Sequence, residues 1–191
     1  MKNLRKNKVQ SLHERFSHIY PDKKVLEVSG TSEDELGRKI RSEILEKKIP
    51  SLDIKAPVAN VYRGSCLFEK GGPYPELYGL SPQKAKNDRR LKEKGSLVHY
   101  SYEDTKYPKR PRAAFYYWIY INALLENREL AEQVVKYDAF SDISCSPGGK
   151  PFGAARGAAI FTALSRMGLL EQAEDFERFR KLMSMEEQCN K

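Results

Sequence analysis

The stretch that decides the fold runs from residue 113 to residue 125 and reads AAFYYWIYINALL. A helix that is apolar on almost every side is buried, whereas an amphipathic helix keeps a polar face toward water. We therefore expect 113–125 to form the central helix of the core, with Trp118 as a core residue. The other elements should pack around this helix.

The chain that follows this stretch predicts more helix. A second helix is expected over 128–137, and a loop or short strand over DAFSDISCS. Pro147, Gly148 and Gly149 predict a turn. The Ala- and Gly-rich helix that follows should end at Gly168, and its small residues permit close packing against another element. An acidic amphipathic helix is expected over about 170–183.

In the chain that precedes the central stretch, a first helix is expected over about 3–19, followed by Pro21. Its apolar residues recur at helical spacing: Leu4, Leu12, Phe16 and Ile19. Lys24 to Val28 is expected to form a short strand. Ser32 with Glu35 fits a capping box, which predicts a helix that continues to about Lys48, before Pro50.

The middle of the chain contains the clearest local signals for loops and for the start and end of a helix. Periodicity does not decide between strand and helix over 57–70, and GGPYPELYG after it predicts a loop. Ser81 as N-cap and Pro82 at the first helical position predict a helix that ends at Gly95. The alternation over 97–102 predicts a strand, and KYPKRP a loop.

Length and composition limit the class of protein. A chain of 191 residues and 22.0 kDa is expected to form a single domain over 1–191, with a core over about 24–170. Hydrophobic residues make up 40% of the chain, which is too many for a disordered protein. The pattern predicts a predominantly helical α+β domain with two or three short strands. No signal peptide or membrane span is expected, so we expect a cytoplasmic location.

The positive charge is local. The formal net charge is +8, yet residues 1–8 contribute +4 and residues 84–112 contribute +6. The second stretch interleaves ten basic residues with three tyrosines, a mixture that suits phosphate contacts and ring stacking. A solvated helix face with a surface loop explains the charge equally well.

Common catalytic and metal-binding signatures are absent from the sequence. There is no P-loop, GxGxxG or GxSxG motif, and the three cysteines and three histidines lack the spacing of a zinc site. We therefore expect no metal and no cofactor. Polar residues instead lie next to Gly-rich or aromatic segments, where they could bind a ligand or serve only the structure: Tyr62, Arg63, Glu69, Lys86, Asp88, Arg89, Asp138, Asp142 and Arg156.

Five segments in order resemble the NADAR family, and most closely its branch found beside DarT-type ADP-ribosyltransferase toxins. They are VANVYRGSCLFEKGGPY, SPQKAKNDRRL, PRAAFYYWIYINALLENREL, YDAFSDI and ARGAAIF, which together cover roughly residues 24–170. The resemblance implies a compact α+β fold in which 59–68 is helical. It also implies an N-glycosidase that removes ADP-ribose from guanine bases in DNA, as an antitoxin or counter-defence factor against a toxin on a separate chain.

The resemblance also implies a set of site residues. A carboxylate would stabilise the positive charge that develops on the ribose, with Asp142 as first choice and Glu69 and Asp138 behind it. ADP-ribosylated DNA or nucleoside would be bound by residues that match the family's pocket helix, loop and final helix. The expected ligand-binding residues are Tyr62, Arg63, Cys66, Gly71, Gly72, Tyr74, Lys86, Asp88, Arg89 and Arg156, with Tyr116 as a further stacking ring.

Two positions depart from the family pattern. Ala59 and Cys66 stand where relatives tend to have a glutamate and a lysine. Loss of a pocket carboxylate and a pocket amine leaves two alternatives open. One is a glycosidase for a small phosphorylated N-riboside. The other is a protein that binds ADP-ribose or nucleic acid without turnover.

Overall fold

The central helix α5 (Ala114–Glu126) organises the core, as predicted from its sequence. In the computed structural model, which describes residues 2–111, 113–144 and 153–189, nearly all of its side chains are buried. The neighbours of α5 are mainly helices: α3 (Val58–Gly64), α6 (Arg128–Val134), α7 (Ala154–Arg166) and α8 (Phe176–Cys189). The predicted turn at Pro147–Gly149 lies outside the described residues.

The helix-rich α+β class is confirmed, but the described residues form seven short strands where the sequence predicted two or three. β1 (Val25–Glu27) and β7 (Ala139–Ser141) form a parallel pair in the register Leu26 to Phe140. β2 (Glu46–Ile49) and β3 (Ile54–Pro57) form an antiparallel hairpin. β4 (Cys66–Phe68), β5 (Leu97–Tyr102) and β6 (Thr105–Tyr107) form a three-stranded antiparallel sheet.

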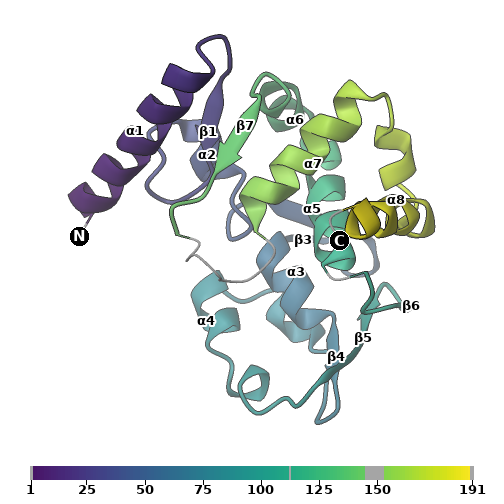
Figure 1. The fold of residues 1–191 in the computed structure, drawn as a ribbon. Helices are drawn as coiled ribbons and strands as arrows, with labels where there is room; N and C mark the ends of the chain where they lie inside the picture. Colours follow the sequence, from purple (N-terminus) through teal and green to yellow (C-terminus); the bar gives the residue numbers. More distant parts are fainter. Residues whose placement is uncertain (1, 112, 145–152, 190–191) are drawn as a thin grey trace.

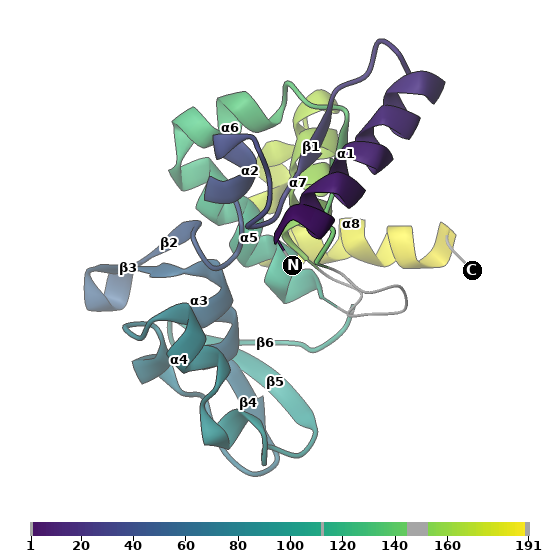
Figure 2. The ribbon, with the colours of Figure 1, turned by 90° about the vertical axis from the view of Figure 1, so that its left-hand side faces the viewer.

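These elements occupy two ends of the molecule with α5 between them. The β1–β7 pair, α6 and the short helix α2 (Glu35–Lys39) lie at one end. The β4–β5–β6 sheet and the short helix α4 (Pro82–Lys86) lie at the other, with α3 joining them to α5 (Figures 1 and 2). Helix α5 therefore lies between the two groups of elements, with one of its ends toward each group.

Helix α1 (Lys2–Ile19) matches the predicted first helix and runs along the outside of β1 in both views (Figures 1 and 2). Val9 is its buried apolar side chain, whereas Leu4, Leu12 and Ile19 are exposed. Helix α1 therefore contacts the core through only a small apolar area. No helix of the described residues is both long and apolar enough to cross a membrane.

The helix predicted from Ser32 to about Lys48 is wrong. The N-cap is Asp34, whose carboxylate accepts a hydrogen bond from Leu36 N at 2.8 Å, and α2 ends at Lys39. The chain then enters strand β2, in which Lys47 and Ile49 point inward. Pairing with β3 and burial of Lys47 against Glu126 override the helical spacing.

The helix predicted from Ser81 to Gly95 begins as expected but is too long. Ser81 caps the first turn and Pro82 occupies its first position, yet α4 ends at Lys86. Asp88 then caps a separate turn of 3-10 helix, Arg89–Leu91. The segment 57–70 contains both candidates, helix α3 and then strand β4, so the helix implied over 59–68 is confirmed only in its first half.

Candidate functional site

A partly buried tyrosine, Tyr62, and a buried one, Tyr116, form the centre of the candidate site. The rings of Tyr62 on α3 and Tyr116 on α5 meet edge to face with centroids 5.5 Å apart. The Tyr62 hydroxyl lies 3.4 Å from that of Tyr100. Burial raises the pKa of both Tyr62 and Tyr116, so both phenols are neutral near pH 7 and can serve as apolar surfaces with a hydroxyl at the rim.

Arg63 lies beside these rings on the same turn of α3. Its Nη1 atom is buried and has no hydrogen-bond partner among the described residues. Burial lowers the pKa of the guanidinium, while the nearby charge of Glu43 opposes that change. A buried N–H group without a partner costs free energy, so this atom is suited to an acceptor that arrives with a ligand.

Asp142 lies near enough to Tyr116 for its charge to act on the phenol, and Arg156 lies near Tyr117. Asp142 follows β7, and its Oδ1 atom accepts hydrogen bonds from the amide, at 2.9 Å, and the hydroxyl of Ser144. Burial chiefly raises the pKa of Tyr116, and the charge of Asp142 adds to that rise. The Arg156 guanidinium lies 5.9 Å from the centroid of the Tyr117 ring.

These residues come from four separate parts of the chain. We call them the tyrosine site: Tyr62, Arg63, Tyr116, Tyr117, Asp142 and Arg156. It combines aromatic faces, cationic groups and one carboxylate. Such a set can stack a base, bind phosphate and stabilise positive charge on a sugar.

Cys66 and Ala59 are buried packing residues next to the tyrosine site. The Cys66 thiol donates toward the carbonyl of Tyr62 at 3.2 Å, and burial raises its pKa to about 12. Ala59 is buried on α3. Neither position supplies a carboxylate or a cation, so the charged groups of this site come from Arg63, Asp142 and Arg156.

Gly71 and Gly72 allow the chain to fold back closely on β4. Both have positive φ, and a Cβ at Gly72 would lie 2.3 Å from the carbonyl oxygen of Cys66. A Cβ at Gly71 would meet the Tyr74 hydroxyl at 2.6 Å. Both glycines are thus explained by close contacts within the chain itself.

The Tyr74 ring already has a partner. The Arg90 guanidinium lies 4.3 Å from its centroid, and Arg90 also pairs with Glu76 and Asp88. Asp88 caps the turn that follows α4 by accepting from Arg90 N at 2.9 Å. Tyr74 and Asp88 therefore stabilise the α4 region.

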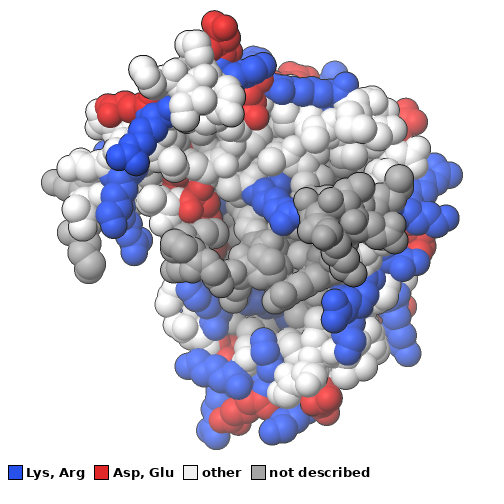
Figure 3. Space-filling view, in the orientation of Figure 1, with Lys and Arg blue, Asp and Glu red and all other residues white. Residues whose placement is uncertain are grey.

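Lys86 and Arg89 lie on the surface of the same region. Arg89 pairs with Glu93 at 2.9 Å, and both side chains are exposed. Lys and Arg side chains also gather along α1 on the same face of the molecule (Figure 3). The exposed basic residues of these two segments are Arg5, Lys6, Lys8, Arg15, Lys84, Lys86, Arg89, Arg90 and Lys92.

The other two predicted carboxylates lie away from the tyrosine site. Glu69 accepts from Ser96 N at 2.9 Å, so it ties the residue after β4 to the residue before β5 in this antiparallel pair. Asp138 precedes β7, accepts from Lys24 N at 2.9 Å and pairs with Arg166 at 3.1 Å. Each carboxylate joins two segments of the fold, and the structure brings neither beside Tyr116.

Sequence reasoning missed Glu27, which is 2% exposed in strand β1. Its carboxylate accepts from the Ser141 hydroxyl at 2.5 Å and from Ile143 N at 2.8 Å. His13 Nε2 on α1 lies 2.9 Å from the same hydroxyl oxygen. A charged residue inside an apolar strand, as in VLEV, is the signal that could have revealed it.

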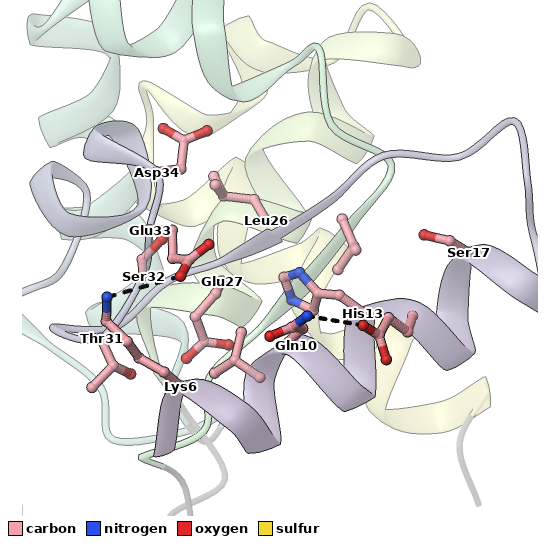
Figure 4. A pocket seen from close by; sticks show the side chains of 13 residues that line it. Lys6, Gln10, His13, Ser17, Leu26, Glu27, Thr31, Ser32, Glu33 and Asp34 are labelled. Atoms are coloured by element: carbon pink, nitrogen blue, oxygen red, sulfur yellow. Dashed lines mark hydrogen bonds and ion pairs between the residues drawn. The ribbon is translucent and has the colours of Figure 1, made fainter. Parts of the chain in front are cut away.

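Glu27 and His13 also line a cavity between α1, β1 and the loop at residues 31–34 (Figure 4). Its volume is about 410 Å³. Its rim combines acidic and basic side chains, including an ion pair between Lys6 and Glu33 at 3.8 Å. In the described part of the chain, no three His, Cys, Asp or Glu side chains are grouped as they are in a metal site.

Comparison with known proteins gives one family. A search of the curated proteins found no match. The model of the NADAR-DarT1 family, described as DarT1-associated NADAR antitoxin, matches residues 2–191. Because this match spans almost the whole chain, the protein belongs to the DarT1-associated NADAR antitoxins.

Proposed function

We propose that this antitoxin is an N-glycosidase that removes ADP-ribose from guanine bases in DNA. The observation that carries the proposal is the buried Nη1 of Arg63, which has no partner among the described residues and lies next to Tyr62 and Tyr116. A guanidinium in this setting favours a phosphate, because charge-assisted and bidentate contacts are the strong ones. The diphosphate of ADP-ribose supplies such a group.

The reaction would break the bond between the anomeric carbon of ribose and a guanine nitrogen. The bonding electron pair leaves with the base, the sugar becomes positively charged, and water adds to the anomeric carbon with loss of a proton. The Asp142 carboxylate would stabilise the charged sugar and accept that proton, which returns to the departing base or to solvent. Its hydrogen bonds from Ser144 fix the carboxylate orientation.

The surface charge supports a polynucleotide substrate. Exposed basic residues of α1 and of the α4 region lie on one face of the molecule (Figure 3). A free nucleoside cannot reach such separated groups, whereas a DNA strand carries a phosphate at every nucleotide. The proposed role of these residues is to bind the strand on both sides of the modified base.

The test compares two substrates and two arginine variants. The purified protein is incubated with an oligonucleotide containing ADP-ribosylated guanine and with ADP-ribosyl-guanosine, and free ADP-ribose is measured by chromatography. Arg63→Gln should raise KM about 10- to 100-fold on both substrates, which corresponds to one or two charge-assisted hydrogen bonds. Arg128→Gln, at an exposed arginine of α6 paired with Glu132, is the matched control and should change nothing.

The salt dependence of KM distinguishes DNA-backbone contacts from contacts in the tyrosine site. KM for the oligonucleotide should rise steeply between 50 and 200 mM salt, and KM for the nucleoside only weakly. Binding of the oligonucleotide with no ADP-ribose released from either substrate would overturn the proposal in favour of a protein that binds without turnover. Release from the nucleoside alone would assign a small riboside as substrate.

A further inference from the structure

Glu27 is a buried carboxylate that no ion pair of the described residues neutralises. Two hydrogen bonds satisfy it instead, one to each carboxylate oxygen: Ser141 Oγ donates to Oε2 at 2.5 Å and Ile143 N to Oε1 at 2.8 Å. A buried charge without a cation is costly, and an apolar residue would serve packing alone at lower cost. A carboxylate here suggests a task beyond packing.

The two donors flank Asp142. Ser141 is the last residue of β7 and Ile143 is two positions further, so Glu27 holds the residues before and after Asp142. The backbone adds a third tie, because Val28 N donates to the carbonyl of Ser141 at 2.7 Å. These contacts restrict the backbone from which the Asp142 side chain projects.

His13 extends this arrangement to α1. The Ser141 hydroxyl proton points to Glu27, so His13 Nε2, at 2.9 Å from Ser141 Oγ, is assigned as the donor to that oxygen. Figure 4 shows the His13 and Glu27 side chains facing each other across the space between α1 and β1. The chain of contacts therefore runs from His13 through Ser141 to Glu27.

We propose that Glu27 is a positioning residue for Asp142, acting through Ser141 and Ile143, with His13 fixing the Ser141 hydroxyl. The inference rests on the proposed function, in which Asp142 stabilises the charged ribose. Catalytic groups must be held within a fraction of an ångström, and a displacement of about 1 Å costs about 100-fold in rate. Glu27 would thus affect turnover without touching the substrate.

The test separates turnover from binding and from folding. Glu27→Gln has the same shape, but its amide presents one acceptor to two donors, so one contact is lost. We expect kcat on the ADP-ribosylated oligonucleotide to fall about 10- to 100-fold while KM stays within about twofold. Hydrogen exchange should become faster in the peptide that covers residues 139–144.

The matched control is Glu126→Gln. Glu126 is a partly buried carboxylate that, like Glu27, accepts a hydrogen bond from a backbone amide, here Lys48 N at 2.8 Å, but it lies outside the tyrosine site. This variant should lose stability and keep its kcat. Ser141→Ala, which removes one donor, should lower kcat, and Ser141→Thr, which keeps the hydroxyl, should restore it. If Glu27→Gln does not fold, the comparison of kcat between Ser141→Ala and Ser141→Thr tests the positioning role instead.

The outcomes distinguish the two proposals. If the wild-type protein releases no ADP-ribose, the proposed function fails. If the wild type is active and Asp142→Asn remains fully active, the role of Asp142 fails, and the positioning role of Glu27 fails with it. If the wild type is active and Asp142→Asn is inactive, but Glu27→Gln and Ser141→Ala turn over like Glu126→Gln, the positioning role alone is overturned. Unchanged exchange over residues 139–144 in a folded Glu27→Gln variant would also overturn it.

Discussion

Gly157 on α7 lies directly against the ring of Tyr120 on α5, so that a Cβ at Gly157 would come within 2.5 Å of Tyr120 Cδ1. The ring has little freedom to move, because Tyr120 is fully buried and its hydroxyl donates to the carbonyl of Ile40 at 2.8 Å. This contact sets how closely α7, which carries Arg156, approaches the central helix.

Gly157→Ala should therefore destabilise the protein although alanine favours helices. Overpacking costs about 1–3 kcal/mol, with the upper part of that range, about 2–3 kcal/mol, expected where the neighbouring ring cannot move, and the gain in helix propensity offsets about 1 kcal/mol of it. We expect the free energy of unfolding to fall by about 1–2 kcal/mol in urea titrations. Gly79→Ala, where a Cβ would meet no atom within 4 Å, is the control and should stay within about 0.5 kcal/mol of wild type. A Gly157→Ala variant as stable as the wild type would refute the close contact.

The Asp138→Asn variant distinguishes the role of Asp138 from that of Asp142, the other aspartate that flanks β7. The hydrogen bond from Lys24 N, together with Arg166 and Lys23, lowers the pKa of Asp138. A depressed pKa contributes stability above the carboxyl's unfolded pKa and loses it as the pH falls. We expect the variant to keep its kcat within about twofold and to show a shallower loss of stability in acid. A severe loss of kcat in the folded variant would instead assign Asp138 to the reaction.

The docking of α1 should weaken in mild acid. Burial lowers the pKa of His13 below its ordinary 6.5, and the charge of Glu27 only partly opposes this. The unfolded state then binds the proton more readily than the folded state, so stability decreases as the pH drops from 6.5 toward the lowered pKa. Thermal unfolding between pH 7 and 5 should show this slope, and His13→Gln should reduce it. Equal slopes in the two proteins would contradict the assignment.

The Cys66 thiol should be unreactive in the folded protein. Burial raises its pKa to about 12, so almost none is thiolate near pH 7. In a background with Cys145→Ser and Cys189→Ser, labelling by a thiol reagent should follow unfolding, with rapid reaction only in denaturant. Rapid labelling under native conditions would show that the thiol is open to solvent, as a ligand-binding Cys66 requires.

The sequence predicted the elements whose signals are local. The all-round apolar stretch identified α5, and alternation identified β5 over 97–102. The helix predicted up to Lys48 was wrong because Lys47 finds Glu126 at 2.6 Å, a partner 79 residues away. A lysine at an inward strand position looks like a surface residue until that partner is known.

The residues of the candidate site stay a prediction, which rests on the family resemblance. Tyr62, Arg63, Asp142 and Arg156 were selected from separate motifs, and the structure places them around Tyr116 and Tyr117. Glu27 was missed because its donors lie more than 110 residues further along the chain. The local pattern VLEV marks Glu27 as an unusual strand residue, but it does not show which distant segment supplies the donors.

The most direct test of the central claim is the release of ADP-ribose under single-turnover conditions from an oligonucleotide with ADP-ribosylated guanine, with wild-type protein and with Asp142→Asn. Loss of the charge-stabilising carboxylate should slow release by at least about 100-fold while the variant still binds the oligonucleotide. Equal rates of release would contradict the role of Asp142, and absence of release by the wild type would contradict the proposed glycosidase.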